Sequence, residues 1–243
     1  MRKPKWKGGE IEIDMKAKAV IFDLDGTLLD TLDDIAASAN RVLAVRGFPT
    51  HGREAYRRFV GDGSAVLMTR ALPPDMRSEK NIQDALQAFL EDYGRNWHDA
   101  TRPYPGIIDL LMRLQSRMIG MAVVTNKPHR FTGMMMDHFF DGFPFHPILG
   151  QVNGIPKKPH PRQALDAAAA LGVTPETCVF LGDSAVDMET ARRAGMIPVG
   201  AAWGFRTRHE LQNAGAAAII ERPLELMDII DSSAAAKNEA GPK

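Results

Sequence analysis

The chain has 243 residues, of which 44% are hydrophobic and 25% charged, a balance typical of a globular protein long enough for one large domain or two modest ones. Thirty acidic residues balance thirty basic ones, so no overall field favours a nucleic acid or an anionic membrane as a partner. A single cysteine, Cys178, excludes an internal disulfide framework. Because no apolar run approaches the ~20 residues of a membrane span and no signal peptide is evident, we expect a soluble cytoplasmic protein.

The first predicted strand is the apolar run at 19–22. Three further runs of the same kind follow at 121–126, 178–183 and 197–203, and a short fifth strand is predicted near 216–220. Continuous apolar runs of this type are typical of parallel strands that are covered on both faces.

Helical patterns separate the later strands. The first helix begins at Pro105 and is expected to place four apolar residues on one flank. Two further helices, at 161–172 and 185–195, end in glycine, a natural helix end. The alternation predicts an α/β fold with a doubly wound, mostly parallel Rossmann-like sheet. The four apolar residues of the first helix are Ile108, Leu111, Met112 and Leu114.

One long interval breaks the alternation, because residues 30–105 contain only helical patterns. We expect it to form a separate all-α domain inserted after the first strand. The catalytic core would then be discontinuous, consisting of 15–29 and 106–231. The polar ends, 1–14 and 232–243, are expected to be flexible tails.

Polar residues stand where the predicted strands end, and ligands of an open α/β sheet bind beyond the carboxyl ends of its strands. Each residue has a simpler interpretation, such as an Asp-Gly turn, a helix cap or a solvated lysine. Their joint placement at successive strand ends makes coincidence improbable. They are Asp23, Asp25 and Gly26 after the first strand, Thr125 and Asn126 at the end of the second, Lys158 ahead of the helix at 161–172, and Asp183 with Asp187 after the third.

These residue types fit phosphoryl transfer. A carboxylate such as Asp23 can attack phosphorus and carry it as an aspartyl-phosphate, with Asp183 and a backbone carbonyl helping to hold Mg²⁺. Lys158, the Thr125 hydroxyl and backbone N–H groups around Gly26 would neutralise the phosphoryl oxygens. A second carboxylate, Asp25, is near enough to act as general acid and then as general base.

Four segments in this order, FDLDGTLLD, TNK, KKPHP and GDSAVD, resemble the signature motifs of the haloacid dehalogenase-like phosphohydrolase superfamily. The helical insert is similar to the superfamily's small cap domain. The resemblance implies Asp23 as nucleophile and Asp25 as acid/base, and an acid at the position of Asp25 favours phosphate-ester chemistry. It further implies a phosphate site of Gly26, Thr125, Asn126 and Lys158, and a Mg²⁺ site at Asp23, Asp25, Asp183 and Asp187. In this site Asp187 would support either the metal or Lys158.

A narrower similarity, to phosphoglycolate phosphatases, rests on the segments at 60–72, 104–107, 123–128 and 203–205. Within the first, a glycine loop enters a helix whose free N–H groups would suit a small carboxylate, although a flexible interhelical turn is an equal alternative. Arg70 would add positive charge or point to solvent, and Asp62 fits poorly beside an anionic substrate. The predicted substrate residues are Gly61, Gly63, Ser64 and Arg70.

The leading hypothesis is therefore a Mg²⁺-dependent phosphatase that hydrolyses a small phosphorylated metabolite, 2-phosphoglycolate first, as a monomer or homodimer. The alternatives are a phosphatase for another small metabolite or pyrophosphate, an inactive binding protein, and a phosphomutase of the β-phosphoglucomutase type. The sequence leans against the mutase, because Asp25-Gly26-Thr27-Leu28 resembles the hydrolase version of the motif, whereas mutases typically carry Gly-Val in this stretch.

Overall fold

The computed structural model describes residues 17–235, and their side chains through residue 231. The expected N-terminal tail, 1–14, and most of the expected C-terminal tail lie outside the described residues. Residues 232–235 continue helix α10, Glu225–Ala235, so that the helix extends beyond the predicted end of the core. No described helix is long and apolar enough to cross a membrane.

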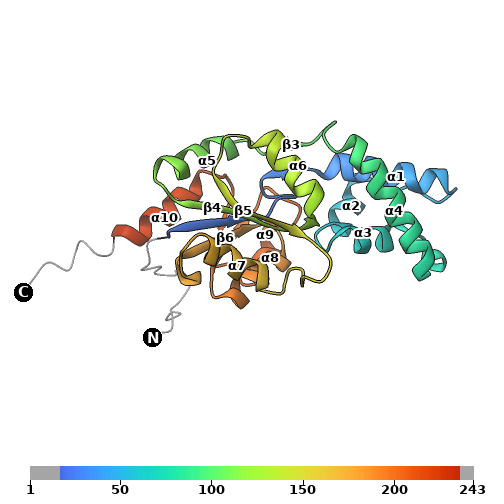
Figure 1. The fold of residues 1–243 in the computed structure, drawn as a ribbon. Coiled ribbons are helices and arrows are strands. Elements are labelled where there is room, and N and C mark those ends of the chain that lie inside the picture. Colours follow the sequence, from blue (N-terminus) through green and yellow to red (C-terminus); the bar gives the residue numbers. More distant parts are fainter. Residues whose placement is uncertain (1–16, 236–243) are drawn as a thin grey trace, which may run out of the picture.

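The centre of the molecule is a six-stranded sheet in the order β5-β4-β1-β6-β7-β8 (Figure 1). Every neighbouring pair is parallel, which confirms the predicted doubly wound sheet. The strands in sheet order are β5 (Phe145–Gln151), β4 (Gly120–Pro128), β1 (Ala19–Phe22), β6 (Cys178–Gly182), β7 (Ile197–Ala201) and β8 (Ala218–Ile220).

The sequence pattern predicts no strand at β5. This strand lies at the sheet edge, contains Pro147 and is mostly only half-buried, so it lacks the continuous apolar run that marks a central strand. The strand predicted at 197–203 ends earlier, at Ala201, which leaves Trp203 in the loop that follows.

Helices cover both faces of the sheet (Figure 1). Alternate residues of β1 point to opposite faces, so Val20 and Phe22 join one apolar cluster while Ala19 and Ile21 join another. The first cluster packs on α5 (Ile107–Ser116), α6 (His129–Phe139) and α10, and the second on α7 (Arg162–Ala170) and α8 (Ala185–Ala194). Helix α9 (Arg208–Asn213) contacts β7 and β8.

Helix α5 buries a different flank from the predicted one. Ile107, Leu110, Leu111 and Leu114 are fully buried, whereas Ile108 and Met112 are exposed. The buried residues have the regular i, i+3, i+4, i+7 spacing of a helix that packs along one stripe on the sheet. The prediction was wrong because the helix has two apolar stripes one residue apart.

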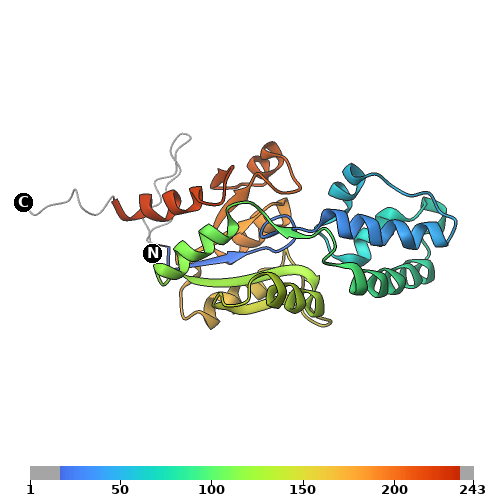
Figure 2. The same cartoon turned by 90° about the horizontal axis from the view of Figure 1, so that it is seen from above.

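Four helices form a group beside the carboxyl ends of the strands, set apart from the sheet (Figure 2). They are α1 (Leu32–Val45), α2 (Arg53–Phe59), α3 (Ser64–Ala71) and α4 (Glu79–Asn96), and we call them the cap helices. The chain enters and leaves this group through β2 (Leu29–Asp30) and β3 (Arg102–Pro103), which pair antiparallel. We keep the division into a 30–105 cap and a 15–29 plus 106–231 core as a proposal, which this separation supports.

Candidate active site

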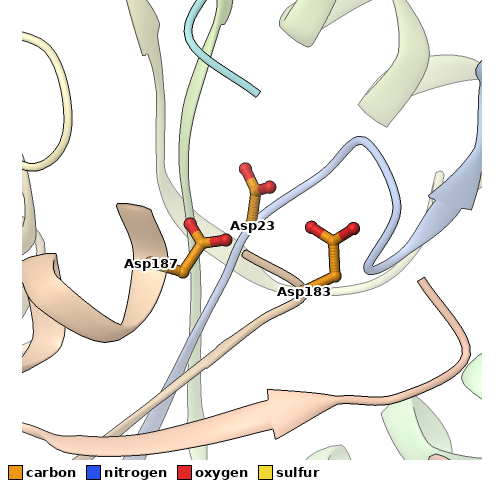
Figure 3. Close-up of side chains that lie close together, drawn as sticks. All are labelled: Asp23, Asp183 and Asp187. Atoms are coloured by element: carbon orange, nitrogen blue, oxygen red, sulfur yellow. The ribbon is translucent and has the colours of Figure 1, made fainter. Parts of the chain in front are cut away.

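Three carboxylates gather at the carboxyl end of the sheet, with their side chains pointing to the same side (Figure 3). Asp23 follows β1 and Asp183 follows β6, and the two strands are parallel neighbours in register from Ala19–Cys178 to Phe22–Leu181. Asp187 stands in the first turn of α8, where it faces back toward the strand ends. All three are buried, and each offers an oxygen within 4.8 Å of the others. The structure thus brings together three of the predicted site residues.

Lys158 neutralises part of this charge. Its Nζ lies 2.8 Å from Asp23 Oδ1 and 2.6 Å from Asp187 Oδ1, and its side chain is only 2% exposed. The other oxygen of Asp187, Oδ2, accepts hydrogen bonds from the Ser184 N–H and hydroxyl at 3.0 and 2.6 Å. Both oxygens of Asp187 are therefore engaged, and its contact with Lys158 agrees with one of the two roles implied by the resemblance. Its part in a metal site stays a prediction.

The cluster has an excess of negative charge. Burial raises the pKa of Asp23 to about 6 against the opposing effect of Lys158, and the Asp187 carboxylate adds to the rise. Burial, followed by repulsion from Asp187 and Asp23, raises the pKa of Asp183 well above its usual value. Burial alone would lower the pKa of Lys158, but its two carboxylate partners outweigh burial and raise it, so the lysine is charged at neutral pH.

The three carboxylates, two of which pair with Lys158, form a set of hard oxygen donors that suits Mg²⁺. Asp183 is held for this purpose by the Phe205 N–H, which donates to its Oδ2 at 2.6 Å. The side chain of Asp25 does not join the three, because it turns toward Lys127 instead. The structure therefore does not support the Asp25 carboxylate as a metal ligand.

Gly26 approaches Asp183 so closely that a Cβ atom there would lie 2.3 Å from Asp183 Oδ2. Its φ of +87° is also a conformation that favours glycine. The Gly26 N–H donates to Leu29 O at 2.8 Å, closing the turn after Asp25. The Gly26 N–H is thus engaged within the turn and the residue makes room for Asp183, while phosphate binding by the backbone N–H groups around Gly26 stays a prediction.

The phosphate-binding role of Asn126 stays a prediction, and its side chain joins two loops. Its Oδ1 accepts from the Lys158 N–H at 2.8 Å, and its Nδ2 donates to Lys158 O and to Gly61 O, both at 3.1 Å. The amide therefore holds the Lys158 loop and the cap loop together. Thr125, in contrast, is buried and lines the cavity as expected.

Asp25 forms a second ion pair that the sequence analysis missed. The Nζ of Lys127 lies 2.9 Å from Asp25 Oδ1 and 2.9 Å from the Tyr93 hydroxyl of α4. Burial would lower the pKa of Lys127, but Asp25 and Tyr93 raise it above its usual value. The signal for Lys127 was present, as a lysine directly following Thr125-Asn126 in an apolar strand, whereas nothing marked Tyr93.

A cavity lies between these strand ends and the cap helices, and Asp23 and Asp25 face it. Of the predicted substrate residues, Gly61, Gly63 and Ser64 line it, at the start of α3. Arg70 is outside the lining and pairs with Asp62 at 2.7 Å, so that each neutralises the other. The lining opposite the carboxylates is largely apolar and consists of Ile35, Val60, Leu67, Phe89, Pro128 and Phe131.

This combination of a parallel sheet, a carboxylate cluster at its carboxyl edge and cap helices above it agrees with the comparisons with known proteins. The family model of haloacid dehalogenase-like hydrolases matches residues 20–201. The chain belongs to this family.

Curated relatives place it further, among phosphatases that resemble phosphoglycolate phosphatase. A phosphoglycolate phosphatase of Pseudomonas putida KT2440 is 38% identical over 192 residues, covering 77% of this chain and 70% of the relative. An N-acetylmuramic acid 6-phosphate phosphatase of Pseudomonas aeruginosa PAO1 is 31% identical, covering 89% of this chain and 96% of the relative. The crystal structure of a candidate phosphoglycolate phosphatase from Lactobacillus delbrueckii subsp. bulgaricus is 32% identical with a TM-score of 0.83, covering 89% of this chain and 99% of that one. The protein is a phosphatase.

Proposed function

We propose that the protein is a Mg²⁺-dependent phosphatase that hydrolyses a small phosphate monoester through an aspartyl-phosphate on Asp23. The observation that carries the proposal is the buried cluster of Asp23, Asp183 and Asp187. Asp23 and Asp187 pair with Lys158, and Asp25 lines the same cavity as Asp23. Asp23 and Asp183, supported by Asp187, would hold Mg²⁺. The bound ion would offset the repulsion between the Asp23 carboxylate and an anionic phosphate.

In the first step an oxygen of Asp23 attacks phosphorus, and the bond from phosphorus to the leaving alcohol breaks. Asp25, protonated, gives its proton to the departing oxygen. Lys158 and Thr125 would bind the phosphoryl oxygens, which is supported by the contact of Lys158 with Asp23 and by the place of Thr125 in the cavity lining.

In the second step water attacks the phosphorus of the aspartyl-phosphate. The Asp25 carboxylate takes a proton from this water, and the bond between phosphorus and the Asp23 oxygen breaks. Inorganic phosphate leaves, Asp23 returns as a carboxylate, and Asp25 is protonated again for the next turnover.

For the substrate we favour 2-phosphoglycolate, the ester named in several relatives at 33–38% identity. Its carboxylate would face the N-terminus of α3, where Gly63 and Ser64 line the cavity. A second candidate is N-acetylmuramic acid 6-phosphate, named in the relative of which this chain covers 96%. The largely apolar wall of the cavity is the feature that favours a larger ester of this kind.

The test is phosphate release by the purified protein with Mg²⁺ from phosphoglycolate, N-acetylmuramic acid 6-phosphate, hexose phosphates and pyrophosphate. We expect phosphoglycolate to give the highest kcat/KM, and Asp23→Asn to abolish release from every ester. Full activity of Asp23→Asn would refute the nucleophile. Interconversion of hexose phosphates without free phosphate would instead favour the mutase alternative.

A further inference from the structure

Lys127 is a buried ammonium that the proposed reaction leaves without a task. Its side chain is 4% exposed at the end of β4, and its Nζ lies 2.9 and 3.1 Å from the two oxygens of Asp25. The third contact is the Tyr93 hydroxyl at 2.9 Å. Burying an ammonium is costly unless it is paired and hydrogen-bonded, so these contacts fix where the ammonium lies.

Asp25 depends on this lysine for its orientation. Its carboxylate is 21% exposed toward the cavity, and among the described side chains Lys127 is the one that donates to it. Asp23, by comparison, sits 11% exposed within the Lys158 cluster. Without Lys127, the Asp25 side chain would be free to rotate away from the phosphorus.

Tyr93 holds the lysine from the other side. Its ring stacks on Phe89 of the same helix at a centroid distance of 5.4 Å and meets the edge of Phe131 of α6 at 5.2 Å. Being 2% exposed and held by two rings, it has a fixed hydroxyl position. The arrangement therefore needs three separate elements: the turn after β1, the end of β4, and cap helix α4.

We propose that Lys127 is a positioning residue for the acid/base Asp25, and that Tyr93 completes this support from the cap helix α4. The inference rests on the proposed function, which gives Asp25 the proton transfers. A misplacement of about 1 Å can cost about 100-fold in rate, so a carboxylate that is near the substrate but not oriented transfers protons poorly. The acid/base would thus be held in place only where α4 lies against β4.

The experiment compares two esters that differ in how much they need a general acid. The first is the best alkyl ester found in the phosphate-release screen, whose alkoxide is a poor leaving group and needs a proton. The second is p-nitrophenyl phosphate, whose p-nitrophenolate leaves without a proton. For Lys127→Met we expect kcat/KM to fall about 100-fold on the alkyl ester and less than about 5-fold on p-nitrophenyl phosphate. Because water attack also needs Asp25, p-nitrophenol should appear as a burst followed by a slow steady rate.

Two further variants make the test specific. Tyr93→Phe keeps the ring packing and removes only the hydroxyl, so it should show the same ester dependence with a smaller loss, about 10-fold. In the Asp25→Asn background, Lys127→Met should cost less than about 3-fold on the alkyl ester, because the residue through which it acts is gone. Lys157→Met is the matched control, since Lys157 is an exposed lysine that donates to Asp62 O at 2.7 Å without touching Asp25. Any loss in this control should be equal for both esters.

Equal losses on both esters for Lys127→Met, or an undiminished loss in the Asp25→Asn background, would overturn the inference. A loss confined to KM for esters whose alcohol carries a carboxylate would also overturn it, because Lys127 would then bind the substrate directly. Failure of the proposed function looks different: the unaltered protein would release phosphate from no ester.

Discussion

Asp183 is buried, is repelled by two carboxylates and accepts a hydrogen bond from the Phe205 N–H. Its negative charge therefore lowers the stability of the metal-free protein and raises that of the protein with a bound cation. We predict that Asp183→Asn raises the Tm of the metal-free protein, because an amide oxygen still accepts from Phe205 while the repulsion is gone. The same change should remove most of the Tm increase caused by Mg²⁺. Thermal unfolding with EDTA and with Mg²⁺ measures both. A metal-free Tm that falls in the variant would contradict the account of the cluster.

Gly26 gives a prediction with a built-in comparison. Gly26→Ala should abolish measurable activity and destabilise the protein by more than about 2 kcal/mol, because a Cβ would strike Asp183 Oδ2 at 2.3 Å and Phe205 Cδ2 at 2.8 Å. Gly47 also has a positive φ, +69°, but a Cβ there meets nothing within 4 Å. Gly47→Ala should therefore cost only the backbone term of about 1 kcal/mol and leave activity unchanged. Urea unfolding and phosphate release compare the two, and similar losses in both variants would contradict the close approach.

Cys178 offers a test of burial by its reactivity. Its burial raises the pKa of the thiol to about 11, so that at pH 8 only about one molecule in a thousand carries the thiolate that reacts. We expect no measurable reaction of the native protein with a disulfide reagent at pH 8, and one equivalent after unfolding in urea, where the pKa returns to its usual value. Rapid reaction of the native protein would mean that β6 is less buried than the structure has it.

At the scale of elements, the loop after β7 joins the cap helices to the carboxylate cluster. Arg206 donates to two carbonyls at the end of α2, Arg57 O and Val60 O, the latter at 2.7 Å, and Arg57 donates back to Gly204 O at 2.8 Å. The residue between Gly204 and Arg206 is the one whose N–H binds Asp183. The position of α2 is therefore linked through three consecutive residues to a proposed metal ligand.

Removing this link should weaken substrate binding more than the chemical steps. We predict that Arg206→Met raises KM by about 10-fold, because charged hydrogen bonds to two carbonyls, each worth about 1.5–3 kcal/mol, no longer hold α2 against the sheet. Arg208→Met is the control, since Arg208 lies in the same region but forms an exposed pair with Glu221. Steady-state kinetics on the preferred ester separate KM from kcat. Equal effects of the two substitutions would contradict the role of Arg206.

The elements also show what local sequence can predict. The central strands and the acids that follow them were predicted correctly because each is a local pattern, an apolar run followed by carboxylates, and parallel topology then brings Asp23 and Asp183 together. Edge strand β5 lacks that pattern. The contacts of Lys127 with Asp25 and Tyr93 join residues 102 and 34 positions apart. The first arises from the pairing of β1 with β4, and the second only from the position of α4 beside the end of β4. The partners of the Asn126 side chain likewise come from two distant loops, so local sequence does not predict these contacts.

At the scale of the whole molecule, the cap helices and one face of the sheet share a single apolar cluster. Leu67, Phe89 and Tyr93 of the cap helices belong to the same cluster as Phe131 and Met135 of α6. At the C-terminal end of α4, Trp97 contacts Phe139 of α6, with ring centroids 6.0 Å apart. Separating the cap helices from the sheet would therefore expose apolar surface on both.

We predict that cap helices and sheet unfold in one cooperative transition, because neither can open without exposing apolar surface of the other. The variant Trp6→Phe/Trp203→Phe leaves Trp97 as the single tryptophan of the chain, at the contact between α4 and α6. Urea unfolding followed by its fluorescence should coincide with unfolding followed by far-UV circular dichroism. Mg²⁺ should shift both curves by the same amount, because the carboxylate cluster is lost with the sheet. A fluorescence transition at clearly lower urea would mean that the cap helices detach first, and that the shared cluster contributes little to holding them on the sheet.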